Sequence, residues 1–63
     1  MKTNETFLRV DEAAELAGVS PAAIRKWVSR GTLSAVKISG RLWFRELDVL
    51  EAERRTRLRA GRH

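Results

Sequence analysis

The chain has no cysteine, one histidine and no long apolar run. Without cysteine there is neither a disulfide framework nor a thiolate metal site, and the histidine, His63, is the last residue. No run approaches the roughly 20 apolar residues that span a bilayer, and residues 1–6 lack the apolar stretch of a secretory signal. We therefore expect a cytoplasmic protein with no membrane contact and no bound metal.

The residue types that enzymes use as nucleophiles and bases are also scarce in this chain. A catalytic site needs a nucleophile beside a base, or a metal constellation, and this composition provides neither. The carboxylates stand mostly at expected helix starts, where they favour the helix dipole. The sequence therefore predicts no catalytic residue, no cofactor and no small-molecule ligand, and 63 residues allow one domain whose function lies on its surface.

Acidic residues are missing from the middle of the chain. Residues 20–45 contain six lysine and arginine residues and no carboxylate, whereas residues 46–53 contain four carboxylates and no base. Residues 54–63 add five arginines, and the net formal charge is +5. The middle block predicts a polyanionic partner because it coincides with structured elements. For the last block, a solvated surface is an equally good interpretation.

Apolar spacing predicts a first helix over residues 10–17. Its expected inner side consists of Val10, Ala13, Ala14, Leu16 and Ala17. Gly18 follows as a residue suited to a left-handed helix cap, and Val19 then turns back into the core. Ser20 and Pro21 predict the start of a second helix.

The second helix is expected to end at Gly31. Its apolar stripe consists of Ile24, Trp27 and Val28. Trp27 is therefore interpreted as core rather than as a base-stacking platform. Between residues 34 and 44 the pattern changes to β-branched and aromatic residues, which predicts a β-hairpin with its tip at Ser39-Gly40-Arg41.

The register of this hairpin has two alternatives. A two-residue loop places Trp43 on the face of Val36 and Ile38. A three-residue loop places Leu42 and Phe44 there instead, and we favour this register. The position of Trp43 is left open.

A third helix is expected from about Glu46. Its expected inward residues are Leu47, Val49 and Leu50, with Leu58 as a further candidate before the helix frays into the Arg-rich end. The sequence thus divides into a flexible N-terminus (residues 1–6), one domain (residues 7–53) and a basic, largely disordered tail (residues 54–63).

Two short helices joined by a tight turn, the second with a basic outer face, predict a helix-turn-helix whose second helix enters the DNA major groove. With the hairpin as a wing, the fold class is mainly α with a small β-hairpin, a winged helix-turn-helix. The predicted contacts on the second helix are Ser20, Ala22, Ala23, Arg25, Lys26, Ser29 and Arg30. The predicted wing contacts are Lys37, Ser39, Arg41 and Arg45, and the candidate tail contacts are Arg54, Arg55 and Arg57.

Residues 10–20, VDEAAELAGVS, and residues 24–27, IRKW, resemble the excisionase and MerR-like group of winged helix-turn-helix proteins. The resemblance covers residues 7–52 and continues through Gly31, Leu33, Val36, Ile38, Gly40-Arg41, Phe44 and Asp48-Val49. Arg9 departs from the threonine that commonly caps the first helix in this group, so we expect the cap to shift to Asp11 or to be supplied differently. The long dimerisation helix and effector domain of full MerR-type regulators have no counterpart here.

The resemblance implies a phage or mobile-element excisionase, a recombination directionality factor. Such proteins bind double-stranded DNA at attachment sites, often side by side, bend it, and direct an integrase toward excision. One alternative is a small MerR-like transcriptional regulator using the same residues. Another is a protein-interaction module whose basic tail contacts an acidic partner.

Overall fold

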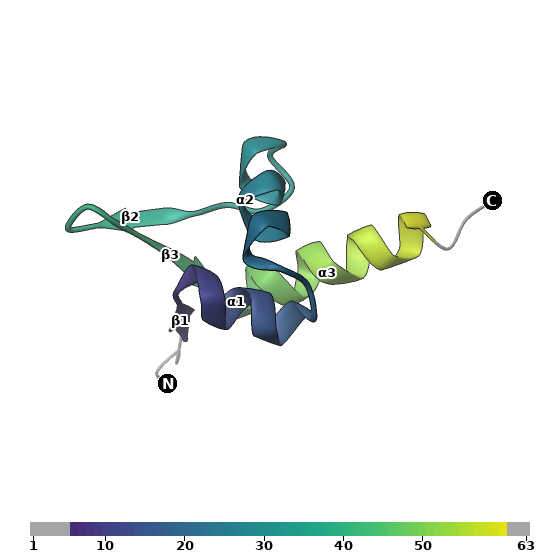
Figure 1. The fold of residues 1–63 in the computed structure, drawn as a ribbon, viewed down its shortest axis with the longest axis horizontal. Coiled ribbons are helices and arrows are strands. Elements are labelled where there is room, and N and C mark those ends of the chain that lie inside the picture. Colours follow the sequence, from purple (N-terminus) through teal and green to yellow (C-terminus); the bar gives the residue numbers. More distant parts are fainter. Residues whose placement is uncertain (1–5, 61–63) are drawn as a thin grey trace, which may run out of the picture.

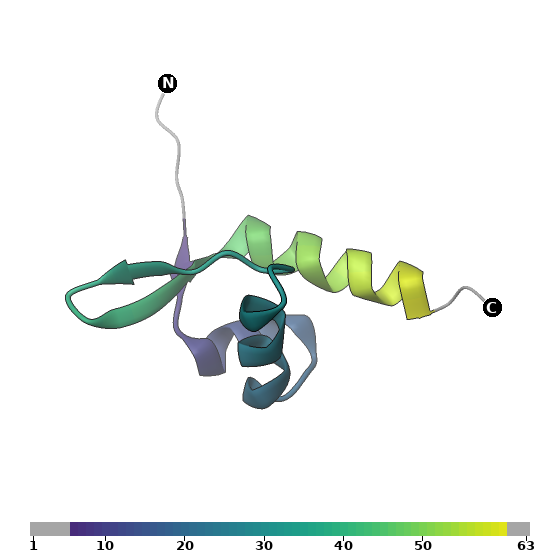
Figure 2. The ribbon, with the colours of Figure 1, turned by 90° about the horizontal axis from the view of Figure 1, so that it is seen from above.

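The computed structural model describes residues 6–60 and has three helices and a three-stranded antiparallel sheet with strand order β1-β3-β2. The elements are β1 (Phe7–Leu8), α1 (Val10–Ala17), α2 (Pro21–Ser29), β2 (Val36–Ile38), β3 (Arg41–Arg45) and α3 (Glu46–Ala60). Figures 1 and 2 show the β2–β3 hairpin and the C-terminal half of α3 extending to opposite sides of the α1–α2 pair. This arrangement confirms the winged helix-turn-helix class. Within residues 6–60, no helix has the length and apolar composition needed to cross a bilayer.

The turn between α1 and α2 forms as the sequence predicts. Gly18 adopts the left-handed conformation (φ 73°), and the N–H of Val19 donates to the carbonyl of Ala14 at 2.9 Å. Val19 is half-buried against the core. Ser20 then caps α2, because its Oγ accepts a hydrogen bond from the N–H of Ala23 at 3.2 Å. These local contacts hold the two helices of the motif together at a tight turn.

The start of α1 shows how the helix forms without a threonine cap. Arg9 occupies the cap position, and its side chain makes no capping bond. The Glu12 carboxylate accepts from the Arg9 N–H at 2.8 Å, and the Asp11 carboxylate accepts from the Glu12 N–H at 3.0 Å. The acids of the first turn therefore satisfy amides that would otherwise lack partners.

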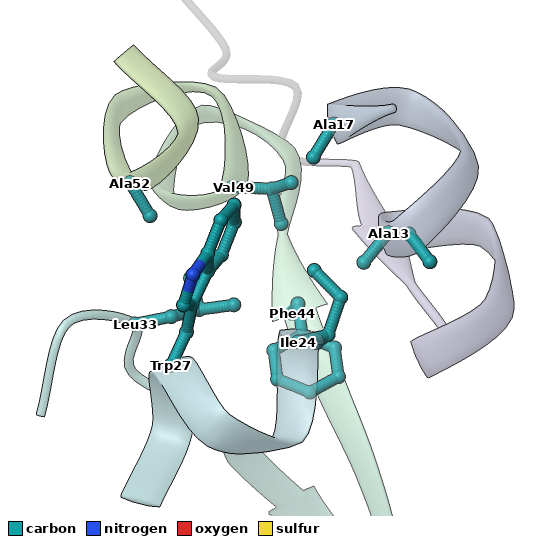
Figure 3. Close-up of a cluster of buried hydrophobic side chains, with 9 residues drawn as sticks. Ala13, Ala17, Ile24, Trp27, Leu33, Phe44, Val49 and Ala52 are labelled. Carbon is teal, nitrogen blue, oxygen red and sulfur yellow. The ribbon is translucent and has the colours of Figure 1, made fainter. Parts of the chain in front are cut away.

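The core lies where α1, α2, α3 and β3 meet (Figure 3). Its buried residues are Ala13, Ala14, Ala17, Ile24, Trp27, Leu33, Phe44, Val49 and Ala52. The alanines of α1 leave room for the large side chains of the other elements, of which Phe44, Ile24 and Val49 are fully buried. Trp27 is 8 % exposed, which confirms its interpretation as core.

Several residues expected in the core are exposed, and those predictions are wrong. Leu47, Leu50 and Leu58 of α3 are 75 %, 41 % and 56 % exposed. Val49 is fully buried, which confirms the prediction for that residue, and Ala52, three residues further along, is the other buried contact of the helix. These two residues lie on the opposite side of α3 from the leucines. Leu16 of α1 is likewise 39 % exposed, because the small residues of that helix make its contacts with the core.

The third helix is also longer than the sequence predicts. Residues 54–60 were expected to be largely disordered, but they continue α3 as helix. Ion pairs four residues apart, Glu51–Arg55 at 3.7 Å and Glu53–Arg57 at 3.0 Å, join the acidic and basic halves of the helix. The rest of the predicted tail, residues 61–63, and most of the predicted flexible N-terminus, residues 1–5, lie outside the described residues.

The hairpin adopts the register that we did not favour. Val36 lies opposite Trp43, Lys37 opposite Leu42, and Ile38 opposite Arg41, which leaves a two-residue turn. Our preference for a three-residue loop is therefore wrong. Both turn residues have positive φ, 51° at Ser39 and 77° at Gly40. Two-residue hairpin turns of this kind need that conformation at both positions because it matches the twist of the strands, and serine seldom adopts it.

Replacing Gly40 by alanine tests this turn. A Cβ at Gly40 meets no atom within 4 Å, so the expected loss of about 1–2 kcal/mol comes only from forcing a left-handed backbone on alanine. Amide hydrogen exchange of the hairpin measures the loss. Ser39→Asn is the matched control and is expected to slow exchange, since asparagine suits this turn position. Unchanged exchange in the alanine variant would contradict the two-residue turn.

Candidate nucleic-acid interface

The exposed side of α2 is basic and narrow. Ala22, Arg25, Lys26 and Ser29 are all exposed and, at spacings of three and four residues, project from one side of the helix. No acidic residue occurs in its first turn. Within the part of the chain that the structure describes, neither Arg25 nor Lys26 has a carboxylate partner. Two cations are thus free to contact a ligand, and alanine and serine beside them allow its close approach.

A groove of about 530 Å³ separates this side of α2 from the hairpin. Its lining consists of Arg9, Val10, Arg25, Val28, Ser29, Gly40, Arg41, Leu42 and Phe44. Arginines from three different segments therefore surround one groove, and no carboxylate lines it. Such a surface attracts a polyanion, while its valine, leucine and phenylalanine add apolar contact area.

Arg9 is a groove residue that the sequence analysis did not include. Its guanidinium lies 5.4 Å from the centre of the Trp43 ring, a cation–π distance. Phe7 pairs with Arg45 and Leu8 with Phe44, so the next residue along, Arg9, comes beside Trp43. A strand of two residues has no strong sequence signal, and the sequence alone indicates for Arg9 only a place at the start of the first helix. Trp43 is half-buried between Arg9 and Val36.

The N-terminus of α2 has the hydroxyl cap that the sequence predicts. The Ser20 hydroxyl accepts from the N–H of Ala23, so both groups are engaged in capping. The N–H of Ala22, at the second helical position, has no carbonyl partner within an α-helix. Of the predicted amide donors, Ala22 is therefore the one best placed for a phosphate.

The wing residues divide between the groove and the rest of the hairpin. Arg41 lines the groove together with Arg25 and Ser29. Lys37 and Ser39 are exposed on the hairpin outside that lining. Lys37 lies opposite Leu42 and so shares the hairpin face that contributes Leu42 and Phe44 to the groove.

Arg45 lies apart from these residues. It occupies the last position of β3, where Nη1 is 3.9 Å from Oδ2 of Asp48 and the guanidinium is 5.9 Å from the centre of the Phe7 ring. These contacts tie Arg45 to the junction of the sheet with α3. The structure therefore does not bring it together with the tip of the wing.

Arg30 lies apart from the groove, and of the candidate tail residues only Arg55 shares a hollow with it. Arg30 caps the end of α2 and lines a hollow of about 340 Å³ together with Arg55 and Arg59 of α3. Arg54 is exposed. Arg57 donates from Nε to Oε2 of Glu53 at 3.0 Å, and this bond raises the pKa of Arg57 above its ordinary value. No group of three or more metal-binding side chains occurs within residues 6–60.

The comparison with known families agrees with this geometry. The chain matches the helix-turn-helix domain model over residues 7–57, which include β1, both helices of the motif, the hairpin and most of α3. No curated protein and no solved structure matches the chain. The matched family includes excisionase-like DNA-binding proteins and supports DNA as the partner. The chain belongs to the helix-turn-helix domain family.

Proposed function

We propose that the chain binds double-stranded DNA in a sequence-specific manner, with α2 in the major groove and the hairpin as a wing against the neighbouring backbone or minor groove. The observation that carries this proposal is the carboxylate-free groove in which Arg9, Arg25 and Arg41 meet. Duplex DNA carries a dense row of phosphates and is the polyanion to which a helix and a hairpin fit side by side.

Each part of the surface has a distinct role in this proposal. Arg25 and Lys26 reach base edges, where an arginine or lysine pairs with the acceptors of guanine. Ala22 and Ser29 keep the contact side of α2 narrow, and the Ala22 N–H faces a phosphate. Arg41 and Lys37 contact the backbone or a narrow minor groove.

We further propose that this binding serves DNA excision, with the chain acting as a recombination directionality factor. The resemblance of residues 10–20 and 24–27 to excisionases supports this role. An excision assay with an integrase and its attachment-site DNA, with and without this chain, tests it directly. Occupancy of a promoter with no effect on recombination would favour a transcriptional regulator instead.

The contribution of phosphate contacts is tested by the salt dependence of duplex binding. Because each neutralised phosphate releases counterion, the logarithm of the affinity should fall with the logarithm of salt concentration by about 0.9 per contact. Lys37→Ala and Arg41→Ala should each reduce that slope by about one contact and weaken all duplexes alike. Fluorescence anisotropy with a labelled duplex measures both quantities.

Arg59→Ala is the matched control for this experiment. Arg59 is not among the predicted contacts and lies outside the groove lining, so its removal should leave the slope nearly unchanged. An affinity that does not vary with salt would rule out the proposed phosphate contacts.

A further inference from the structure

The outer side of α3 bears an apolar surface that the DNA-binding proposal does not use. We define the α3 stripe as Leu47, Leu50, Glu51, Arg54 and Leu58, which are all exposed. These residues follow one another at helical spacing and lie on the side of α3 opposite Val49 and Ala52, the residues that contact the core. No residue between 6 and 60 covers Leu47, which is 75 % exposed.

The intervals between four residues of the stripe are the same whether they are counted from the N-terminus or from the C-terminus of α3. Leu47, Glu51, Arg54 and Leu58 are separated by intervals of four, three and four residues. A second copy of α3 running antiparallel therefore places Leu47 opposite the partner's Leu58, and Glu51 opposite the partner's Arg54. In these four layers leucine meets leucine and carboxylate meets guanidinium.

The charge of the whole helix favours the same orientation. Glu46, Asp48, Glu51 and Glu53 make the N-terminal half of α3 acidic. Arg54, Arg55, Arg57 and Arg59 make its C-terminal half basic. An antiparallel partner brings each half beside a half of opposite charge, whereas a parallel partner brings like charges together, which is unfavourable.

A shallow hollow on this side of the helix gives the partner's leucine a place to pack. It measures about 200 Å³ and is lined by Glu51, Arg54, Arg55 and Leu58. Within the described residues Arg54 has no carboxylate partner, and Glu51 has only the 3.7 Å pair with Arg55. Arg54 is thus available to a second molecule, and Glu51 is held only by an exposed ion pair within its own helix.

From these observations we propose that the chain forms a weak symmetric homodimer through antiparallel contact of two α3 stripes. The DNA groove takes no residue from α3, so this dimer leaves it open. The association differs from side-by-side binding on DNA, because it is two-fold symmetric and needs no duplex.

Sedimentation equilibrium without DNA tests the dimer. Because the interface is small, a concentration range from about 10 µM to about 1 mM is needed. Glu51→Arg and Arg54→Glu should each weaken association about ten-fold or more, since like charges then face each other. The double variant exchanges the two charges and should recover wild-type association.

Further samples test whether association depends on the α3 stripe itself. An equimolar mixture of the two single variants should associate more strongly than either alone, because their charges are complementary. Leu47→Ser should weaken association, whereas Leu16→Ser, at an exposed leucine of α1, should not. Circular dichroism verifies that each variant is folded. A wild-type monomer at every concentration, or a double variant as weak as the single variants, would overturn the proposal.

Discussion

Replacing Phe44 by alanine is expected to leave about half of the molecules or more unfolded at 25 °C. Removing a fully buried phenylalanine ring costs about 3–5 kcal/mol, from lost burial and from the cavity left behind. A core in a chain of this size supplies only about 3–5 kcal/mol of stability. The expected loss is therefore as large as the whole free energy of unfolding. Urea denaturation followed by far-ultraviolet circular dichroism measures it.

The size of this effect follows from the position of the ring. Phe44 is 1 % exposed and comes from β3, the central strand, which pairs with both β1 and β2. Its side chain belongs to the buried cluster that also holds Ile24 of α2 and Val49 of α3 (Figure 3). The domain has no disulfide to compensate for its loss.

Leu42→Ala is the matched control for the core. Leu42 lies on the same face of β3 as Phe44, two residues nearer the hairpin turn, and is 44 % exposed. Because its side chain is only partly removed from water, truncation should cost less than about 1.5 kcal/mol. Similar unfolding midpoints for the two variants would show that Phe44 is not the centre of the core.

The helix-turn-helix could be predicted from sequence because its signals are local. Gly18, Ser20 and Pro21 each act within a few residues of their own position, through a left-handed cap, a hydroxyl cap and a fixed φ. Burial of Ile24 and Trp27 follows from their spacing along one helix. Such features need no knowledge of how distant segments meet.

The errors concern features that depend on distant segments. The leucines of α3 satisfied helical spacing, but the side of a helix that is buried depends on what it packs against, and here Val49 and Ala52 contact the core. The hairpin register depended on Ser39 adopting a positive φ, which serine does not favour. Arg9 joined the groove only because β1 pairs with β3.

The structure brings some of the predicted site residues together and separates others. Arg25, Ser29 and Arg41 were expected on two separate elements, and the structure places all three in the lining of one groove. Arg45 was grouped with the wing by its place in the sequence, yet it lies beside Asp48 at the other end of the strand. Arg41 and Arg45 carry the same charge, but Arg41 is next to the hairpin turn and Arg45 is at the far end of β3. The distance of each arginine from the turn therefore decides whether it belongs to the tip of the wing.

Replacing Arg25 and Lys26 together by alanine is expected to remove most of the preference for one DNA sequence over another. A bidentate contact with a base contributes about 1–3 kcal/mol of discrimination, so the preferred and random duplexes should become nearly equal in affinity. The preferred duplex is first selected from a randomised pool with the wild-type chain. Anisotropy titrations of both duplexes with both proteins then give the ratio of affinities.

The Arg25→Lys variant distinguishes a contact of Arg25 with a base from a contact that needs only its positive charge. Lysine keeps the positive charge at the groove but lacks the planar pair of donors with which arginine binds guanine. If Arg25 pairs with a base, this variant should lose preference for the selected sequence while its salt dependence stays close to that of the wild type. If it keeps full preference, the planar pair of donors of Arg25 is not needed for recognition, and the preference comes from a single charged donor at this position, from Lys26 or from the wing. An unchanged affinity for all duplexes after loss of both residues would mean that α2 does not enter the major groove at all.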